Sequence, residues 1–256
     1  ILRKLILVFF AVSFQFSFCQ DYWKVNSSSK HENKIDIAKH IKYLSLENKS
    51  FTRKILSIKN NEFLKIDFPN EKGELEFFSL KETKTLSKKI QLKYPNIRTF
   101  RGYSDTRKNV VLRITSSPQG ISGTLRTPKG FVFLQPIKGS NTEHIFYRSN
   151  KYNYIEEKFF CKTHSVKISS SIKKINQRKS KKVIDREAKS FKIAIAASGE
   201  YTEFWGDNND QNGTNSEDAF AAVVSTINRL NEIMEVDLGI RLIIVSDASL
   251  MYEDKS

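Results

Sequence analysis

The chain has little of several residue types, and each shortage excludes a class of protein. Two cysteines in 256 residues exclude a disulfide-rich scaffold. All four histidines precede residue 165, so residues 191–256 hold no imidazole base or ligand. The sequence also lacks a phosphate-binding glycine loop, a dinucleotide-binding fingerprint and the Gly-x-Ser-x-Gly elbow of hydrolases. With 39% hydrophobic and 28% charged residues, the chain is typical of a globular protein.

Charge is divided unevenly along the chain. Its 43 basic and 28 acidic side chains give a net charge of +15. Residues 191–256 hold 12 acidic and 4 basic side chains, net −8, so residues 1–190 hold 16 acidic and 39 basic ones, net +23. A positive chain often binds nucleic acid or a membrane, but this division favours attraction between the two regions instead. We therefore expect an intramolecular contact and no nucleic-acid partner.

The first 19 residues are typical of a secretory signal peptide. Two basic residues precede a mostly apolar run from Leu5 to Phe18, and Ser17 and Cys19 are the small residues expected before a cleavage site. The run is shorter than a membrane-spanning helix, and polar residues interrupt it. We expect a secreted, extracellular protein without a stable membrane anchor. The alternative is a buried N-terminal strand or helix.

Residues 54–154 carry the pattern of a β-rich domain. Short runs of aromatic and β-branched residues are separated by turns that contain proline or glycine. The runs are residues 63–68, 75–80, 109–114 and 130–134, and the turns are residues 69–73, 117–120 and 127–130. The pattern predicts a mainly antiparallel domain within residues 20–161, with one helix over residues 87–93.

Residues 162–190 have a different composition. They hold ten lysines and arginines, only two acidic residues and no sustained apolar periodicity. Such a segment cannot bury enough apolar surface to offset its ordering entropy, so we expect an exposed linker that is cut within residues 173–189. A nucleic-acid-binding arm is the alternative, but the aromatic residues needed for base stacking are missing.

Residues 191–256 indicate a strand, a helix and a second strand. The apolar runs 191–197 and 240–245 suit strands buried on both faces, which predicts a parallel pair with a right-handed crossover and an α+β fold overall. Asn215 or Ser216 would cap the helix, which would end at residues 237–239. Its predicted apolar face is Phe220, Val223, Val224, Ile227, Leu230, Ile233 and Met234.

Four acidic residues lie between the first strand and the helix. Glu200, Glu203, Asp207 and Asp210 lack the regular ligand spacing of a Ca²⁺ loop. A solvated loop is therefore favoured over a Ca²⁺ site, which stays an alternative.

Several segments together resemble one protein family. Residues 191–204, 222–231 and 237–242 resemble the start of the catalytic domain of bacterial reprolysin-like (adamalysin-type) zinc metallopeptidases of the metzincin clan. Residues 68–73, 93–102 and 130–136 resemble the propeptide of these enzymes. The resemblance implies a signal peptide over 1–19, a mostly β propeptide over 20–161, a basic linker over 162–190 and the first βαβ unit of the catalytic domain over 191–256.

The resemblance also implies an activity. A secreted zinc metalloendopeptidase zymogen would hydrolyse peptide bonds in protein or peptide substrates. The family holds Zn²⁺ on a His-Glu-x-x-His-x-x-Gly-x-x-His helix that this sequence does not contain. Family order places that helix beyond Ser256, so no catalytic residue is expected within the chain, which by itself would be inactive. The alternatives are a secreted binding or adhesion module without catalysis and an inactive peptidase homologue.

Cys161 is the one candidate metal ligand. In zymogens of this clan a prodomain thiolate occupies the fourth zinc position and displaces the catalytic water. The resemblance makes Cys161 the candidate for this inhibitory role, although no glycine follows it as often happens in the family. The alternatives are a small buried side chain and, together with His164, half of a structural zinc site.

Overall fold

The computed structural model describes residues 22–26, 41–59, 62–148 and 189–254. The predicted signal peptide, Cys161 and the linker up to residue 188 lie outside these ranges. The described strands are β1 (Trp23–Asn26), β2 (Ile41–Leu46), β3 (Leu64–Pro69), β4 (Leu75–Thr83), β5 (Arg98–Ser104), β6 (Val111–Ser117), β7 (Gly120–Thr127), β8 (Gly130–Pro136), β9 (Glu143–Arg148), β10 (Lys189–Ile193) and β11 (Ile240–Ile244). The helices are α2 (Asn48–Leu56), α3 (Lys88–Lys93), α4 (Gly199–Trp205), α5 (Asn215–Asp237) and the 3₁₀ turn η3 (Ala248–Leu250).

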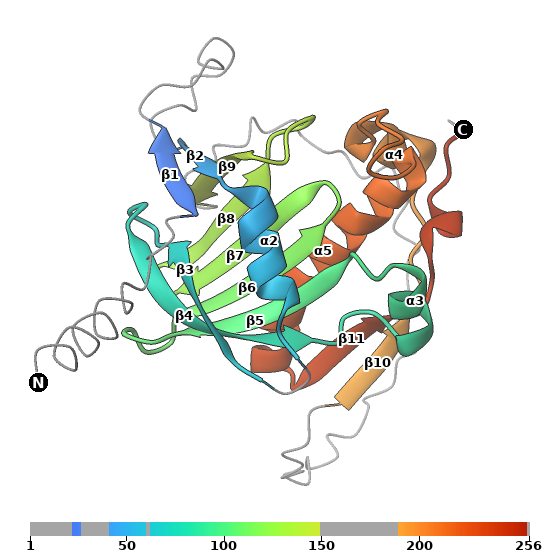
Figure 1. Ribbon diagram of the computed structural model, residues 1–256. Helices are drawn as coiled ribbons and strands as arrows, with labels where there is room; N and C mark the ends of the chain where they lie inside the picture. The colour runs from blue at the N-terminus through green and yellow to red at the C-terminus, as the bar shows by residue number, and fades with distance from the viewer. Residues whose placement is uncertain (1–21, 27–40, 60–61, 149–188, 255–256) are drawn as a thin grey trace, which may run out of the picture.

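Nine strands form one antiparallel sheet in the order β1-β2-β9-β8-β7-β6-β5-β4-β3 (Figure 1). The three predicted turns join β3 to β4, β6 to β7 and β7 to β8, and each pair is antiparallel. Gly73, Gly120 and Gly130 take the positive φ angles that these turns need. The predicted antiparallel β region is therefore confirmed, and we call the described residues 22–148 the sheet unit.

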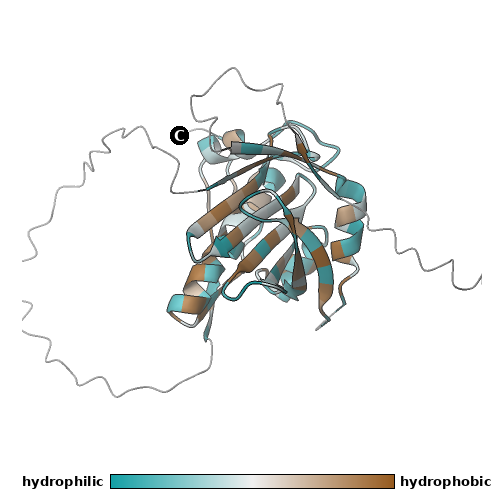
Figure 2. Ribbon diagram, turned by 90° about the vertical axis from the view of Figure 1, so that its left-hand side faces the viewer, coloured by the Kyte–Doolittle hydropathy of each residue, from teal (hydrophilic) through white to brown (hydrophobic). Residues whose placement is uncertain are grey.

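The sheet has two chemically different faces because side chains alternate along each strand. The first face is apolar and is covered by Phe51 and Ile55 of α2. Its buried residues include Phe78, Leu80, Phe100, Leu112, Ile114, Ile121, Leu125, Val132, Leu134 and Phe146. The second face carries threonines and arginines, and α5 packs on it along β6. Figure 1 shows α2 and α5 on opposite sides of the sheet, and Figure 2 shows the alternating hydropathy along the strands.

The C-terminal unit comprises residues 189–254, and its two strands are parallel as predicted. The register runs from Lys189 opposite Ile240 to Ile193 opposite Ile244. Three details of the prediction are wrong. The first strand begins at Lys189, inside the expected linker, and ends at Ile193. The side chain of Phe191 is 50% exposed, although it was expected to be buried. A short helix, α4, replaces part of the expected acidic loop.

The long helix exists where it was predicted, but its cap and its buried face differ. Thr214, rather than Asn215 or Ser216, is the N-cap, and its hydroxyl forms a capping box with Glu217. Leu230 and Ile233 were expected in the core and are 36% and 39% exposed. Asn228, Asn231 and Glu232 are buried instead. The C-terminal half of α5 packs on the polar second face of the sheet and not on an apolar layer.

A second core joins the two units. It contains apolar residues of α5 and β11 together with Leu86, Ile90, Tyr94 and Ile97 from the connection between β4 and β5. Helix α3 in this connection confirms the predicted helix, and Ser87 caps it. None of the described helices is long and apolar enough to cross a membrane.

Candidate functional site: the contact between the sheet unit and helix α5

The contact begins with three arginines on neighbouring strands. Arg101 of β5, Arg113 of β6 and Arg126 of β7 all lie on the second face, and Arg101 stands directly opposite Arg113 in the antiparallel register. Like charges in directly opposite positions destabilise a strand pair. The sheet therefore needs a negative partner here, and α5 supplies it.

Glu232 of α5 is that partner. Its side chain is 1% exposed and receives three guanidinium groups. Nε of Arg113 lies 2.8 Å from Oε2, Nε of Arg126 lies 2.9 Å from Oε1, and Nη2 of Arg101 donates to Oε1 at 3.1 Å. All three arginines belong to the sheet unit. A buried carboxylate is tolerated only when it is paired in this way.

Glu235, one turn later, extends the network. It accepts from Nη2 of Arg113 at 2.8 Å and from Nε of Arg241 in β11 at 2.7 Å. Burial raises the pKa of Glu235, but the hydrogen bond from Arg241 and the charge of Arg113 outweigh burial and hold the pKa below its usual value. Only Arg113 is wholly buried, and it contacts both carboxylates. The other arginines keep contact with water, which accommodates the excess of four cations over two anions.

Amide groups continue the polar contact toward the start of α5. Nδ2 of Asn228 donates to the carbonyl oxygen of Ile114 at 2.9 Å and to the hydroxyl of Thr115 at 3.1 Å. Asp218 is buried and accepts from the Gln119 amide in the β6–β7 turn. It also accepts from the backbone N–H of Asp207 at 3.0 Å. Polar bonds thus cross the contact along four turns of the helix.

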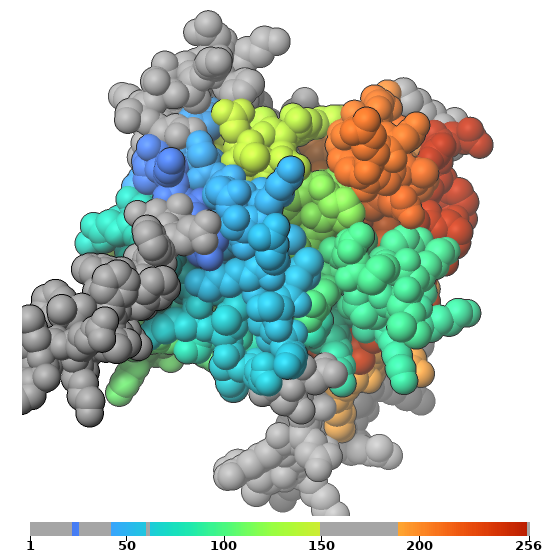
Figure 3. All heavy atoms as spheres, in the orientation of Figure 1, coloured from blue at the N-terminus to red at the C-terminus, as the bar shows by residue number. Residues whose placement is uncertain are grey.

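The other end of the contact is apolar and is made by residues 85–97, which we call the docking segment. Its first residues form a parallel β-bridge with β11: Ile244 donates to the carbonyl of Thr85 at 2.8 Å, and Ser87 donates to the carbonyl of Ile244 at 2.9 Å. The ring of Tyr94 packs on Phe220 with centroids 4.9 Å apart, and its hydroxyl accepts from the backbone of Ala248 at 3.2 Å. Figure 3 shows this segment against the C-terminal unit.

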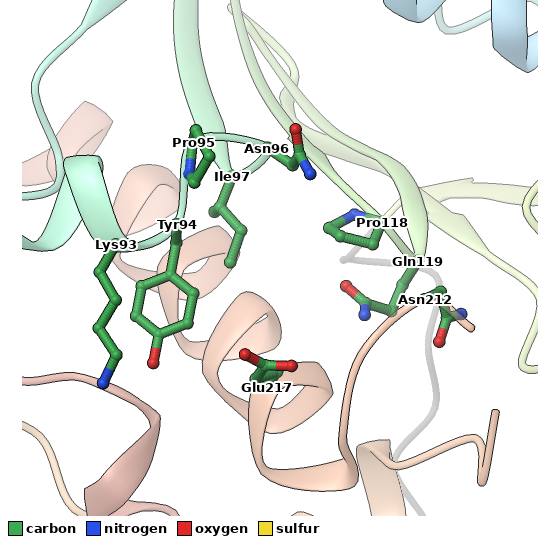
Figure 4. A pocket seen from close by; sticks show the side chains of 9 residues that line it. All are labelled: Lys93, Tyr94, Pro95, Asn96, Ile97, Pro118, Gln119, Asn212 and Glu217. Carbon is green, nitrogen blue, oxygen red and sulfur yellow. The ribbon is translucent and has the colours of Figure 1, made fainter. Parts of the chain in front are cut away.

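A small cavity of about 170 Å³ lies between the two ends of the contact (Figure 4). The docking segment, the β6–β7 turn and the start of α5 meet around it. Its lining is Lys93, Tyr94, Pro95, Asn96, Ile97, Pro118, Gln119, Asn212 and Glu217. The carboxylate of Glu217 already accepts from the backbone N–H of Thr214 in the capping box. The lining holds no histidine, cysteine or serine, so it offers no nucleophile and base in the usual combinations.

The sequence-predicted site residues do not meet in a metal centre. Cys161 lies outside the described residues. Glu200 and Glu203 lie on α4, and Asp207 and Asp210 lie in the following loop. Within the described ranges no group of three or more His, Cys, Asp or Glu could hold a metal ion. No catalytic step is assigned to the described residues.

His144 is the one histidine that the structure describes, and it lies on the first face of the sheet. It is fully buried, and its ring packs edge-on against Trp23 with centroids 5.6 Å apart. Burial lowers its pKa to about 4, although contacts with backbone carbonyls oppose the shift. The neutral ring is thus a component of the apolar core.

The central residues of the contact were missed by the sequence interpretation. Arg113 interrupts an apolar strand, and Glu232 falls on the helix between Ile227 and Met234 of the predicted apolar face. Opposite charges within the apolar patterns of β6 and α5 are a signal that the strand and the helix pack against each other, because a buried charge needs a partner. No protein-family model, curated protein or solved structure matches the chain. The family resemblance therefore stays a prediction from the residues.

Proposed function

We propose that the chain is the N-terminal part of the precursor of a secreted zinc metalloendopeptidase. In this proposal the sheet unit is the pro-region, and residues 189–254 begin the peptidase domain. One observation carries the proposal: the sheet unit holds the C-terminal unit through a contact rich in charges and amides, centred on Glu232. Full-length enzyme would act on protein or peptide substrates after the two units separate.

The chemistry of the contact supports a separable arrangement. All three guanidinium partners of Glu232 come from the sheet unit, whereas both amide bonds of Asn231 go to Leu242 within the C-terminal unit. On separation, Glu232 and Asn228 would become polar surface that water can hydrate, and the bonds of Asn231 would persist. The apolar end of the contact, at the docking segment, would be uncovered at the same time.

The place of cutting follows from the same argument. Lys189 is already in β10 and donates to the carbonyl of Gly239 at 2.8 Å. Cutting is therefore proposed within residues 173–188, which would leave β10 intact. In this proposal Zn²⁺ is bound by precursor residues that follow residue 256. Before cutting, the thiolate of Cys161 would occupy the fourth position on that Zn²⁺ and inhibit the enzyme.

The test is made on the full precursor read from the gene. We expect the reading frame after residue 256 to encode a His-Glu-x-x-His helix, and the expressed protein to hydrolyse casein only after cutting within residues 173–188. A zinc chelator should abolish this hydrolysis. In the uncut precursor, Cys161→Ser should raise the activity, whereas Cys161→Ser after cutting should change nothing.

Two results would overturn the proposal. A reading frame without a His-Glu-x-x-His helix would favour a secreted binding module instead. A complete zinc helix with no hydrolysis before or after cutting would favour an inactive homologue.

A further inference from the structure

The docking segment marks a binding site on the C-terminal unit. Two backbone hydrogen bonds join Thr85 and Ser87 to Ile244, so the segment forms a single parallel β-bridge with β11 through Leu86. A helix then turns the chain so that Ile90 and Tyr94 follow Leu86 at intervals of four residues on one side. The segment therefore combines one strand step with a short amphipathic helix.

The side chains of the docking segment are buried almost entirely by the C-terminal unit. Leu86, Ile90, Tyr94 and Ile97 belong to the second core and to no part of the first. Their neighbours in that core are Ala219, Phe220, Ala221, Val223, Val224, Ile227, Ile244, Ala248 and Met251. By contrast Leu92, on the opposite side of α3, is 75% exposed. The core of the C-terminal unit is thus completed by four side chains of the docking segment, which belongs to the sheet unit.

We propose that Ile244 of β11 and the adjoining apolar face of α5 form a recognition site for peptides that combine one strand step with a short amphipathic helix. The ligand class is a peptide with a large apolar residue in the strand position of Leu86, followed by apolar residues four and eight positions later. The docking segment occupies this site within the chain. The site opens when the sheet unit leaves, a step that rests on the proposed function.

Two physical arguments support a peptide as the occupant. Once the docking segment leaves, Ile244 presents an unpaired N–H and C=O that another chain can satisfy, as in other cases of strand addition, while Leu242 keeps its bonds to Asn231. Removal of the docking segment would also uncover Phe220, on which the ring of Tyr94 packs, and an exposed apolar residue of this kind favours a new apolar partner. Backbone hydrogen bonds to Ile244 would contribute affinity for such a peptide. The buried sites now filled by Leu86, Ile90 and Tyr94 would select apolar side chains at the matching peptide positions.

The experiment uses the full chain and a fluorescent synthetic peptide with the sequence of residues 84–98. In the wild type, the tethered docking segment should exclude the peptide, because tethering acts as a local concentration of roughly millimolar order. The variant Leu86→Ala with Ile90→Ala weakens the tethered copy, and fluorescence anisotropy should show at least tenfold tighter peptide binding than in the wild type. The matched control Leu92→Ala should bind like the wild type.

Folding is checked by circular dichroism, and the single variant Tyr94→Ala provides a milder opening if the double variant does not fold. A peptide that carries Leu86→Asp should bind the opened variant at least tenfold more weakly. Equal binding of both peptides, or no gain in a folded variant, would overturn the inference. A dimer of the opened variant that the peptide does not dissociate would identify a second copy as the occupant and also overturn it. The readout is binding, so it is independent of any peptidase activity.

Discussion

The two faces of the sheet are built from the same strands but stabilised by different forces. The first face is filled with aliphatic and aromatic side chains under α2, and its stability comes from apolar burial. The second face buries guanidinium and carboxylate groups under α5, and its stability depends on every charge keeping its partner. The comparison shows that one layer is held by apolar burial and the other by paired charges. Substitutions on the two faces should therefore differ in size and in pH dependence.

The largest effect is expected at Glu232. Glu232→Gln keeps the shape of the side chain but leaves three arginines without their carboxylate, and breaking a buried ion pair costs about 3–5 kcal/mol. Urea unfolding of the full chain measures the loss. Asp210→Asn, which removes a charge from an exposed residue, is the control and should change stability by less than about 0.5 kcal/mol. Equal effects of the two variants would contradict the buried network.

The next effect is a pH dependence that originates on the first face. The folded protein keeps His144 neutral down to about pH 4, whereas the unfolded chain binds a proton below 6.5. The contribution of His144 to the free energy of unfolding should therefore be constant above pH 6.5 and fall by roughly 3 kcal/mol as the pH drops to 4. In His144→Phe this part of the slope should disappear. A slope unchanged by the substitution would show that other groups cause acid unfolding.

Asp218, at the contact between α5 and the β6–β7 turn, should contribute a pH dependence of the opposite direction. Burial raises the pKa of Asp218 to about 6; the neighbouring charge of Asp207 adds to the shift, while hydrogen bonds from the Asp207 backbone and Gln119 oppose it. The unfolded chain loses this proton near pH 3.8, so the contribution of Asp218 to stability falls as the pH rises from 3.8 to 6. Solvent screening limits this loss to about 1–2 kcal/mol.

The variant Asp218→Asn cannot ionise at this position, so the free energy of unfolding of the variant should lack the Asp218 contribution and keep that of His144. Unfolding titrations of the variant and the wild type at pH 4 and pH 8 provide the measurement. A difference between them that is the same at both pH values would assign the effect to the lost hydrogen bonds rather than to charge.

The smallest effect is expected from shortening one buried aliphatic side chain on the first face. Ile114→Val removes one methylene from a fully buried position and should cost about 0.5–1.5 kcal/mol at every pH. Thermal unfolding at pH 5 and pH 8 tests both the size and the constancy. A strong pH dependence here would mean that the two faces are not independent.

The sequence was sufficient for the parts of the fold that depend on local physics. Turns with proline or glycine located three hairpins, Ser87 located the start of α3, and periodicity located α5. Each of these signals lies within a few residues of the structure it specifies.

Long-range pairing was the part that local patterns could not give. Arg113 and Glu232 are 119 residues apart, and only their contact explains why each charge occupies a core position. Without it, Leu230 and Ile233 were assigned to the core because they fit the apolar spacing of the helix. The exposure of Phe191 has the same origin, since only the assembled fold places β10 at an edge of its sheet.

The convergence of three strands on one carboxylate has a consequence for the alignment of the sheet. Because successive side chains point to opposite faces, sliding β5, β6 or β7 by a single residue would turn its arginine into the apolar layer under α2. Glu232 would then meet two guanidinium groups instead of three. Docking of α5 is thus most favourable when β5, β6 and β7 are paired in the correct register. Glu232 alone therefore disfavours sheets in which one of these strands is shifted by a residue.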